Sequence, residues 1–576
     1  MPARIGTTDG ARRCTRRARP EPVTEVRSLP PHRQSRRARR RERRRAGLTI
    51  RPAPARRSEA PASLRHLRTL LGLGLLAAAA GLVVIDLSLP EERAAVVGTV
   101  AGVNAGAGDP RDIAAHNSPV LARNPVDTAN LVVANRIDTP RFSCALHTSF
   151  DAGATWTTPR LPFPEGEEDP PRCYVPTATF EPGGTLHVAF STLAGPGNRP
   201  NAVWLVSSAD GGRSFSPPAR LLGPLAFQPQ IVADDRRPGR LYLTWLQADD
   251  VVNLGFARTG NPINVMRTDD GGRTWGAPVR VSDADRLRAV APTAVVGRDG
   301  ELFVAYLDLG DDRLDYGGAH AGRGGEPYQG SWTLVLARSL DGGDSWQEAE
   351  VDDHVTPTER ILVFLPPFPA LAVDRASGRL YLAVADGRLG DADVWLWTSS
   401  DRGQTFGVAR RVNDTAERDG TAQYLPAVGV APGGRVDVVY YDRRRDGRDR
   451  FNHVSLQSSY DRGRRFGGHV RLSATQFDSR IGFGSALGMP DLGSRLAVTS
   501  ARRRALAVWA DTTSGSEASG KQDLSRAVVA LSRPAGGRGQ VRTAAAASAG
   551  AGVVVLLWAA SGKRRPRARR RPERAR

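Results

Sequence analysis

The chain reads Ser149-Phe150-Asp151-Ala152-Gly153-Ala154-Thr155-Trp156, and this eight-residue pattern, Ser/Thr-x-Asp-x-Gly-x-Thr/Ser-Trp/Phe, returns five more times. The other copies are residues 208–215, 268–275, 339–346, 399–406 and 459–466, and only the last departs from the pattern, with Arg465 in place of Thr or Ser. The six aspartates are 59, 60, 71, 60 and 60 residues apart: Asp151, Asp210, Asp270, Asp341, Asp401 and Asp461. A nearly fixed period of this length predicts a repeat architecture.

Each part of this turn motif has a mechanical explanation. The aspartate accepts hydrogen bonds from the backbone amides of a tight turn, and the glycine adopts the positive φ that the turn needs. The Trp or Phe at the end begins the next strand and packs its ring against the turn. Copies follow strand-like runs such as Ala202-Val203-Trp204-Leu205-Val206. The motif is therefore predicted to be a structural hairpin turn and not a catalytic element.

On these six copies, the chain resembles the sialidase-like β-propellers, in which the pattern is known as the Asp-box or BNR repeat. The resemblance covers residues 110–535. It implies an all-β fold in which blades of four strands surround a central channel.

A second repeat runs ahead of the turn motifs and counts the blades. Each unit begins with a proline beside apolar residues, and a second apolar strand follows. The seven prolines are Pro119, Pro176, Pro229, Pro292, Pro369, Pro426 and Pro490. The seventh unit ends without a turn motif or a fourth strand, and the apolar stretch 94–100 can supply that strand. We therefore favour seven blades closed by an N-terminal strand, with six, the number in the sialidases that the chain resembles, as the alternative.

The net charge of +21 comes from the two ends of the 576-residue chain. Residues 1–68 hold 21 arginines and 5 acidic residues, and residues 563–576 hold 9 basic residues and 1 acidic residue. Removing both leaves a net charge of −3, so the charge of the propeller suggests no nucleic-acid partner. Residues 1–67 are predicted to be a basic, disordered cytoplasmic segment, or an upstream stretch behind a misplaced start. The excess of arginine over lysine is typical of a GC-rich bacterial genome.

Two apolar segments lie just inside these basic ends. We interpret residues 68–89 as a transmembrane signal anchor, with a cleaved signal region as the alternative. Residues 543–562 are interpreted as a second transmembrane helix, with a disordered Ala/Gly stretch as the alternative. The positive-inside rule then puts both termini, including the basic tail 563–576, in the cytoplasm of a cell-membrane protein. The propeller, residues 90–535, is expected outside the cytoplasm.

Cys144 and Cys173 both fall in the region predicted to be exported. Cys144 lies before the first turn motif, and Cys173 lies just before the proline of the next unit. Because neighbouring blades can bring them together in an oxidising compartment, we predict a disulfide, with two buried free thiols as the alternative.

Five second strands end in a carboxylate, and arginines and tyrosines stand near several of them. These strand ends face one side of a propeller, which is the side that carries the active site in the sialidase-like fold. We assign Asp138, Tyr441 and Asp442 to catalysis, and Arg136, Asp308, Asp386, Arg388, Arg443 and Asp511 to ligand binding. These residue types suit glycosidase chemistry or recognition of an anionic sugar. The alternative is that each aspartate only accepts the amides of its own turn.

A sialidase needs three arginines for the substrate carboxylate, a Tyr–Glu pair as nucleophile and an Asp as acid/base. The resemblance implies Asp138 as the acid/base and Tyr440 or Tyr441 as the nucleophile. At the place of the family's Arg-Ile-Pro motif the chain has Asn117-Ser118-Pro119, so that arginine is missing.

Other chemistry is not indicated, because the sequence has no Gly-Lys-Ser/Thr phosphate loop and no His/Cys cluster with zinc spacing. The acidic stretch with Asp308, Asp311, Asp312 and Asp315 is better explained as a solvated loop than as a calcium site. We predict no cofactor and no metal. The sequence thus predicts a membrane-anchored propeller that binds a glycan or a cell-envelope partner. An exo-glycosidase resembling exo-alpha-sialidase is the alternative.

Overall fold

The computed structural model describes residues 62–88, 93–166, 172–195, 198–248, 261–286, 288–312, 328–357, 368–482, 491–532 and 538–561. Contacts divide the chain into two compact units, Met1–Leu73 with Val554–Arg576, and Gly74–Val553. The second unit holds every described β-strand.

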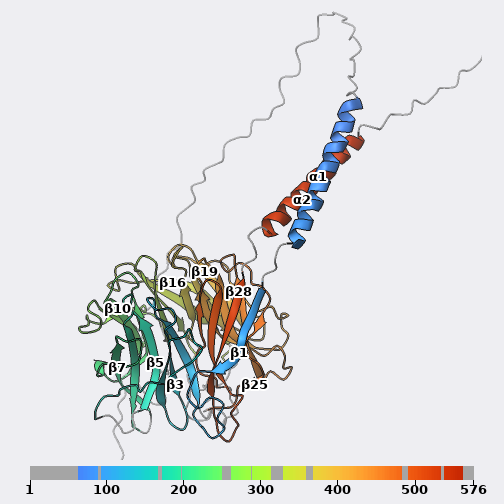
Figure 1. The fold of residues 1–576 in the computed structure, drawn as a ribbon. Helices are drawn as coiled ribbons and strands as arrows, with labels where there is room; N and C mark the ends of the chain where they lie inside the picture. The colour runs from blue at the N-terminus through green and yellow to red at the C-terminus, as the bar shows by residue number, and fades with distance from the viewer. Residues whose placement is uncertain are drawn as a thin grey trace, which may run out of the picture. The chain divides into compact units, whose positions relative to one another are not determined.

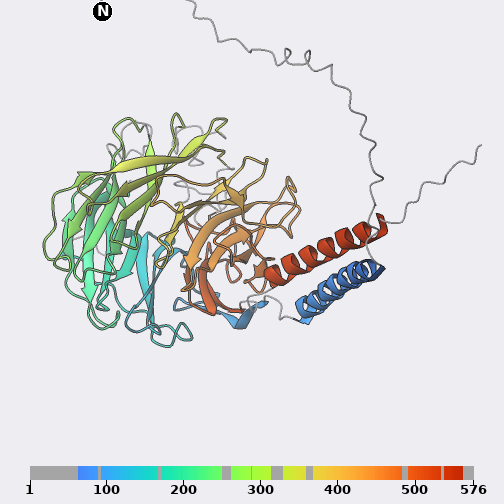
Figure 2. The ribbon, with the colours of Figure 1, turned by 90° about the horizontal axis from the view of Figure 1, so that it is seen from above.

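The strands form seven antiparallel sheets, which we call blades 1 to 7 and which follow one another around a ring (Figures 1 and 2). Blade 1 contains β2 (His116–Arg123), β3 (Leu131–Ile137) and β4 (Ser143–Ser149). Blade 2 contains β5 (Arg172–Phe180), β6 (Leu186–Ala194), β7 (Arg199–Ser208) and β8 (Ala219–Leu222). Blade 3 contains β9 (Ala226–Ala233), β10 (Leu241–Gln247), β11 (Ile263–Thr268) and β12 (Val279–Arg280).

The remaining blades repeat this order. Blade 4 contains β13 (Ala289–Val296), β14 (Leu302–Asp308), β15 (Trp332–Ser339) and β16 (Gln347–Val355). Blade 5 contains β17 (Ala370–Val373), β18 (Leu380–Asp386), β19 (Asp393–Ser399) and β20 (Arg410–Arg411). Blade 6 contains β21 (Gln423–Val430), β22 (Val436–Asp442), β23 (Phe451–Ser459) and β24 (Val470–Arg471), and β25 (Phe477–Asp478) also pairs with β23. Blade 7 contains β26 (Ala497–Ser500), β27 (Arg504–Asp511), β28 (Asp523–Ser532) and β1 (Arg93–Gly102).

The first strand of each blade lines the centre of the ring. These strands contact one another in a closed cycle, in the order β2, β5, β9, β13, β17, β21, β26 and back to β2. The ring therefore has seven members, which confirms seven blades over the alternative of six.

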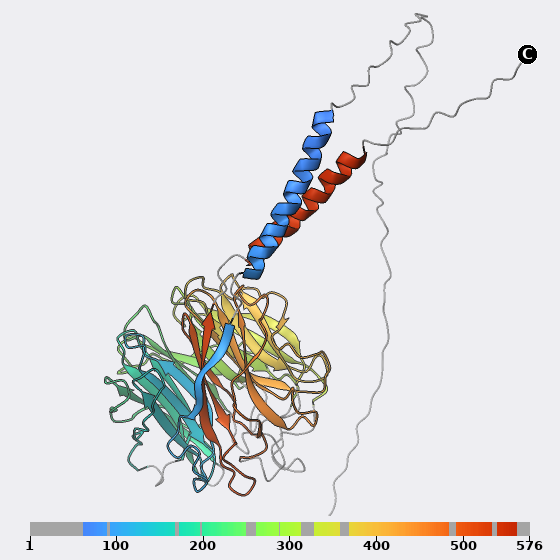
Figure 3. The same ribbon diagram turned by 45° about the vertical axis from the view of Figure 1, so that its right-hand side comes forward.

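The N-terminal strand closes blade 7, as predicted. β1 pairs antiparallel with β28, with Arg93 opposite Ser532 and Val97 opposite Val528 (Figure 3). The last blade thus takes its outermost strand from the N-terminal end of the ring and its other strands from the C-terminal end. Without β1, β28 would present unpaired backbone groups along an exposed edge.

The repeated prolines mark a backbone irregularity within the first strands, and not the start of each unit. In five blades the pairing with the second strand shifts at the proline. The residue before the proline has a positive φ in each case, and these residues are Ser118, Val175, Gln228, Ala291 and Leu425. Such a bulge bends the strand and turns the side chains that precede it toward the channel.

The turn motifs form the hairpins that the sequence predicts. In the first copy, Ser149 donates to Asp151, and the amide and hydroxyl of Thr155 donate to the same carboxylate. The indole of Trp156 donates to the carbonyl oxygen of Gly153, which has a φ of 87°. A Cβ on Gly153 would lie 2.7 Å from Leu506 of blade 7, so the turn packs closely against the neighbouring blade.

The sixth copy shows what its substitution changes. The amide of Arg465 still donates to Asp461 at 2.9 Å. The hydroxyl of Thr or Ser that binds this carboxylate in the other five copies has no counterpart there. We call the face with the six turn motifs the lower face, and the opposite face, where the second strands end, the upper face.

The core lies between neighbouring blades. All seven residues of β14 are buried, and so are all seven of β22. A middle strand is covered on both faces by adjacent blades, so both its faces are buried, and a charged residue there is paired, as Asp437 of β22 is with Arg435. Trp245, Trp397 and Trp509 are among the largest fully buried side chains of these middle strands.

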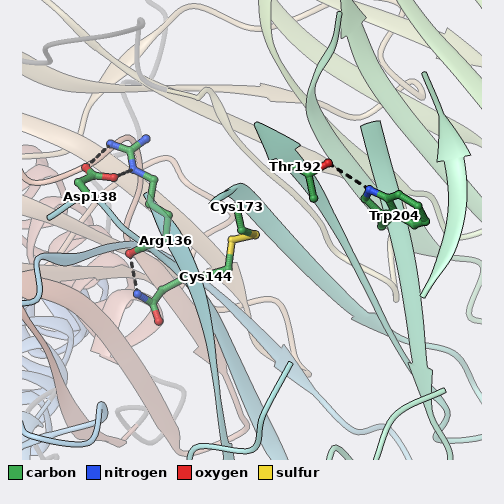
Figure 4. Close-up of a disulfide and its surroundings, with 7 residues drawn as sticks. Arg136, Asp138, Cys144, Cys173, Thr192 and Trp204 are labelled. Carbon is green, nitrogen blue, oxygen red and sulfur yellow. Dashed lines mark hydrogen bonds and ion pairs between the residues drawn. A yellow bond between two sulfur atoms is a disulfide. The ribbon is translucent and has the colours of Figure 1, made fainter. Parts of the chain in front are cut away.

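The predicted disulfide joins blades 1 and 2. Cys144 lies on β4 and Cys173 on β5, and their Cα atoms are 5.4 Å apart (Figure 4). This confirms the bonded alternative over two free thiols.

Replacing both cysteines by alanine is expected to lower the free energy of unfolding by about 3 to 4 kcal/mol, because the unfolded chain then loses a loop constraint. The two cysteines are 29 residues apart in the sequence. Denaturant unfolding of Cys144→Ala/Cys173→Ala measures the loss, and Cys14→Ala is the control, which should leave the transition unchanged. Equal transitions for both variants would contradict the prediction.

The two helices are α1 (Ala62–Ser88) and α2 (Arg538–Ser561). Among the described helices, one window, His66–Val83 of α1, is long and apolar enough to cross a membrane by length and composition, with a mean hydropathy of 1.6. The apolar part of α2, Ala544–Trp558, is shorter than such a window. Of the basic segments predicted at 1–67 and 563–576, residues 1–61 and 563–576 lie outside the described residues.

Candidate functional site

The five predicted aspartates all lie at the ends of second strands on the upper face, each in a different blade. Four of them accept a hydrogen bond from the backbone amide two residues further on. These pairs are Asp308 with Gly310, Asp386 with Arg388, Asp442 with Arg444, and Asp511 with Thr513. These four aspartates therefore do what the alternative explanation predicted: each accepts a backbone amide of its own turn.

Side chains complete the surroundings of two of these aspartates. Asp442 is fully buried, lies 2.6 Å from Nε of Arg444 and accepts from Ser455 at 2.6 Å. Asp386 is paired with Arg388, which also lies 3.0 Å from Asp352. Burial raises the pKa of Asp386, and the guanidinium of Arg388 offsets part of this effect. Asp386 also accepts from the amide of Thr356, which follows β16 of blade 4. Both carboxylates are thus already engaged by groups of the protein.

Asp138 is the exception among the five. The residue two positions on is Pro140, which has no N–H to donate. The carboxylate is bound instead by Nε of Arg136 at 2.8 Å (Figure 4). The side-chain amide of Asn117 also donates to it, at 2.8 Å. The Arg136 and Asp138 side chains are only 5% and 0% exposed. We call Asn117, Arg136 and Asp138 the blade 1 cluster.

Arg136 extends this cluster toward the centre of the ring. It donates to the hydroxyl of Tyr174 on β5 at 2.8 Å. The ring of Tyr174 stacks on Phe227 of blade 3, with centroids 5.5 Å apart. Burial opposes the charge of Arg136, but the carboxylate of Asp138 outweighs it, and the net pKa is raised. Arg136 is therefore a fully ionised, paired group beside an aromatic surface.

Arg495, which the sequence did not single out, lies at the centre of the ring. It precedes β26 of blade 7, and its guanidinium carbon lies 4.8 Å from the ring centroid of Phe368, which precedes β17 of blade 5. The charge of Arg136 and the hydroxyl of Tyr174 also act on it, from blades 1 and 2. Groups from four blades around the ring meet only near its axis.

Two nitrogens of the half-buried Arg495 side chain lack a hydrogen-bond partner among the described residues. Its Nε and Nη2 atoms are buried and make no hydrogen bond. Burial, with the neighbouring charge of Arg136, lowers its pKa to about 9. A buried cation without a carboxylate is costly unless an anion neutralises it. The sequence signal that could have found it is an arginine between two buried leucines, Leu492 and Leu496.

The predicted tyrosines do not reach the blade 1 cluster. The hydroxyl of Tyr441 exchanges hydrogen bonds with the backbone of Ala510, at 3.0 and 3.1 Å. Tyr440 donates to Gln457 at 2.6 Å. Both rings are fully buried, and burial raises the pKa of Tyr441 well above its usual value. The nucleophilic role stays a prediction, but these contacts describe a hydroxyl that joins blades 6 and 7.

A hydrogen-bond path links Arg443 to the blade 1 cluster. Arg443 donates to the hydroxyl of Ser479 at 2.9 Å, and the carbonyl oxygen of Ser479 accepts from the amide of Asp491 at 2.7 Å. The side-chain amide of Gln522 donates to the carbonyl oxygen of Asp491. The carbonyl oxygen of the same side chain accepts from Asn117 at 3.1 Å. Blades 6, 7 and 1 are therefore joined at the upper face by one polar network.

Among the described residues, one group has the arrangement of metal ligands. Ligand atoms of Asp352, Asp353 and His354 lie within 4.8 Å of one another, and two of these residues are exposed. The acidic stretch from Asp308 to Asp315 was considered above as a calcium site. Within it, the carboxylate of Asp312 accepts a hydrogen bond from the indole N–H of Trp332 at 2.9 Å. Asp315 lies outside the described residues.

A cavity of about 520 Å³ lies on the lower face, beside the turn motifs of blades 3 and 4. Its charged side chains already have partners. Nη1 of Arg267 lies 3.3 Å from a carboxylate oxygen of Asp344, and Asp270 accepts a hydrogen bond from the hydroxyl of Thr274. The upper end of the channel, with the blade 1 cluster and Arg495, is therefore the candidate site.

No family model matches the chain, and a search of curated proteins finds no similar sequence. Similar solved structures include a protein of unknown function from Dyadobacter fermentans, 15% identical over 76% of this chain and 99% of that chain, with a TM-score of 0.43. An alpha-L-arabinanase from Penicillium chrysogenum is 14% identical over 76% and 98%, with a TM-score of 0.38. A Hadza microbial sialidase is 13% identical over 70% and 74%, with a TM-score of 0.38. At these identities and TM-scores, no activity is transferred to this chain.

Proposed function

We propose that this protein is a sialidase-like Asp-box propeller, anchored in a membrane with the propeller outside the cytoplasm, that binds an anionic glycan at the upper end of its channel. The observation that carries the ligand proposal is the guanidinium of Arg495, whose buried Nε and Nη2 atoms have no hydrogen-bond partner among the described residues. A carboxylate or sulfate group of a sugar would supply the missing negative charge.

The surroundings of Arg495 suit such a ligand. A guanidinium presents paired N–H groups that match the two oxygens of a carboxylate. The rings of Phe368, Tyr174 and Phe227 near it are buried, and apolar surroundings strengthen the attraction between a guanidinium and an anion. Arg136 is neutralised by Asp138, so it adds hydrogen bonding without a second unpaired charge.

Membrane anchoring is supported by the ends of the chain. His66–Val83 has the length and hydropathy of a span, and arginine-rich runs lie before α1 and after α2. The positive-inside rule places such runs in the cytoplasm and the intervening propeller outside. The disulfide between Cys144 and Cys173 suits an oxidising compartment.

An exo-glycosidase is the second candidate, and one observation favours it. Asp138 is the strand-end aspartate whose carboxylate is not used by its own turn, so it is available for another task. Against this, the carboxylate is fully buried and held by Arg136 and Asn117. Binding is therefore ranked first, and hydrolysis of a panel of fluorogenic glycosides by the purified protein would reverse the ranking.

Replacing Arg495 by glutamine is expected to weaken binding of an acidic oligosaccharide at least tenfold, because a charge-assisted bidentate contact contributes roughly 1.5 to 3 kcal/mol. Calorimetry with a uronic-acid oligosaccharide and its neutral counterpart measures the effect across a glycan panel. Arg495→Lys should retain part of the affinity, since it keeps the charge but loses the paired geometry.

Arg418→Gln is the matched control, because Arg418 is exposed on the loop between β20 and β21, away from the channel axis. It should leave the affinity unchanged. Unfolding should show that Arg495→Gln is no less stable than the unsubstituted protein, since an unpaired buried charge has been removed. Equal affinity for acidic and neutral glycans would contradict the proposal.

A further inference from the structure

The chain enters and leaves the propeller at one point of blade 7. β1 begins at Arg93 and β28 ends at Ser532, and these two residues are paired. α1 ends four residues before β1, and α2 begins five residues after β28. Both helices are therefore tied to the same corner of the same blade.

This corner lies on the lower face. β28 begins with Asp523 opposite Asp511, at the upper end of β27, and runs down to Leu531, whose amide donates to the carbonyl oxygen of Arg503 at 2.8 Å. Arg503 lies in the turn between β26 and β27. The turn thus stands directly beside the point where the chain continues toward both helices.

Three consecutive arginines occupy this turn, Arg502, Arg503 and Arg504, and we call them the arginine turn. All three are exposed, and no described residue forms an ion pair with them. The turn is also held in place, because the guanidinium of Arg435 in blade 6 donates to the carbonyl oxygens of Ala501, Arg502 and Arg504 at 2.9 to 3.2 Å. The result is a concentrated positive charge on a rigid support.

Neighbouring turns of the lower face differ in their charge balance. In the corresponding turn of blade 3, Asp235 precedes Arg236, and in that of blade 4, Asp299 follows Arg298. Those turns contain both acidic and basic side chains, whereas the arginine turn contains no acidic residue. The two short connections to the helices contribute Glu91 and Glu92 on one side and Arg533 on the other.

We propose that the arginine turn docks the propeller onto anionic lipid headgroups, so that the lower face is turned to the membrane and the upper face with Arg495 is turned away. This rests on the proposed membrane anchoring. A connection of five residues reaches at most roughly 18 Å, so a bilayer that holds either helix must lie near this corner. Each arginine near an anionic membrane surface raises the binding constant for that surface on the order of fivefold. Docking on this side leaves the candidate ligand site open to the surroundings.

The test uses the full chain in vesicles of phosphatidylcholine, with or without phosphatidylglycerol. In a Cys14→Ser background, a fluorophore is placed either at Val126→Cys on the lower face or at Ile113→Cys on the upper face. Both positions are exposed, by 66% and 48%. A membrane-impermeant label restricts the signal to outward-facing molecules, and energy transfer to a headgroup-labelled lipid reports proximity to the surface.

We expect stronger transfer from position 126 than from position 113, and a larger difference when phosphatidylglycerol is present. R502S/R503S/R504S should remove the dependence on phosphatidylglycerol. The matched control, R462S/R464S/R465S, removes three exposed arginines of the blade 6 turn motif, beside Asp461 and over blade 5, and should keep it.

Two results would overturn the inference while leaving the anchoring proposal intact: equal transfer from both labels, or a lipid dependence that survives R502S/R503S/R504S. Loss of the unsubstituted protein from the vesicles after an alkaline wash would overturn the anchoring proposal, and the docking inference with it. Circular dichroism and the melting temperature of the triple variants show that the propeller remains folded.

Discussion

Replacing residues 94–100 with a Gly/Ser sequence of the same length is expected to lower the free energy of unfolding by about 5 kcal/mol or more. β1 forms the outer edge of blade 7 and ties the N-terminal end of the ring to the C-terminal strand β28. Val96 and Val100 also pack against the buried cluster of blades 6 and 7. The replacement therefore removes backbone pairing, apolar burial and the closure of the ring together. Denaturant unfolding followed by tryptophan fluorescence measures the loss.

The matched control is the same replacement in β12 (Val279–Arg280), the short outer strand of blade 3. It pairs with β11 but joins no two ends of the ring, so the expected loss is about 1 kcal/mol. The variant of residues 94–100 should also aggregate, because β28 becomes an exposed edge. Similar losses for the two variants would refute the role of β1 as the closing strand.

Asp138→Asn is expected to cost about 3 kcal/mol of stability, because the buried guanidinium of Arg136 loses its ion-pair partner and keeps only the weaker attraction of the Asp491 carboxylate. The two side chains are almost fully buried and 2.8 Å apart. The loss should appear in urea unfolding at neutral pH. Binding of an acidic glycan should change as well, since the positive charge of Arg136 near Arg495 is then less fully neutralised.

Asp511→Asn is the matched control, at the same strand-end position in blade 7. Asp511 accepts from the amide of Thr513 at 2.7 Å, and an asparagine oxygen can still accept that bond. The expected loss is about 1 kcal/mol or less. Adding Arg136→Met to Asp138→Asn should recover part of the stability, because the unpaired charge is then gone. Equal losses for Asp138→Asn and Asp511→Asn would show that the ion pair of Arg136 and Asp138 contributes little to stability.

Much of the fold could be predicted from the sequence because the decisive contacts are local. In the first turn motif, the hydrogen bonds join Ser149, Asp151, Gly153, Thr155 and Trp156, all within eight residues. Such a unit has the same structure wherever it occurs, so its repetition predicts the blades. The count of units against turn motifs then predicted the closing strand, and the structure confirms it.

The sequence predicted the candidate site less well than the fold, because the same residue type can have different structural roles in different blades. An aspartate at a strand end serves as a turn acceptor in four blades and as the partner of a buried arginine in one. The difference was visible in the sequence as Pro140, which cannot donate to Asp138, but its meaning depends on Arg136 and Asn117 being close. The prolines that mark the units likewise lie at bulges, which the apolar pattern alone does not reveal.

The sequence by itself determined the repeat, because the contacts of each turn motif are local. It also predicted seven blades over six, the closing strand, and the disulfide of Cys144 and Cys173 over free thiols, and the structure decided these alternatives. Only the tertiary structure decided the candidate site. The guanidinium of Arg495 packs on the ring of Phe368 and interacts electrostatically with Arg136 and Tyr174. All three residues are distant from Arg495 in the sequence. Whether a buried guanidinium is neutralised depends on the charges that closure of the ring brings around it, and these come from other blades.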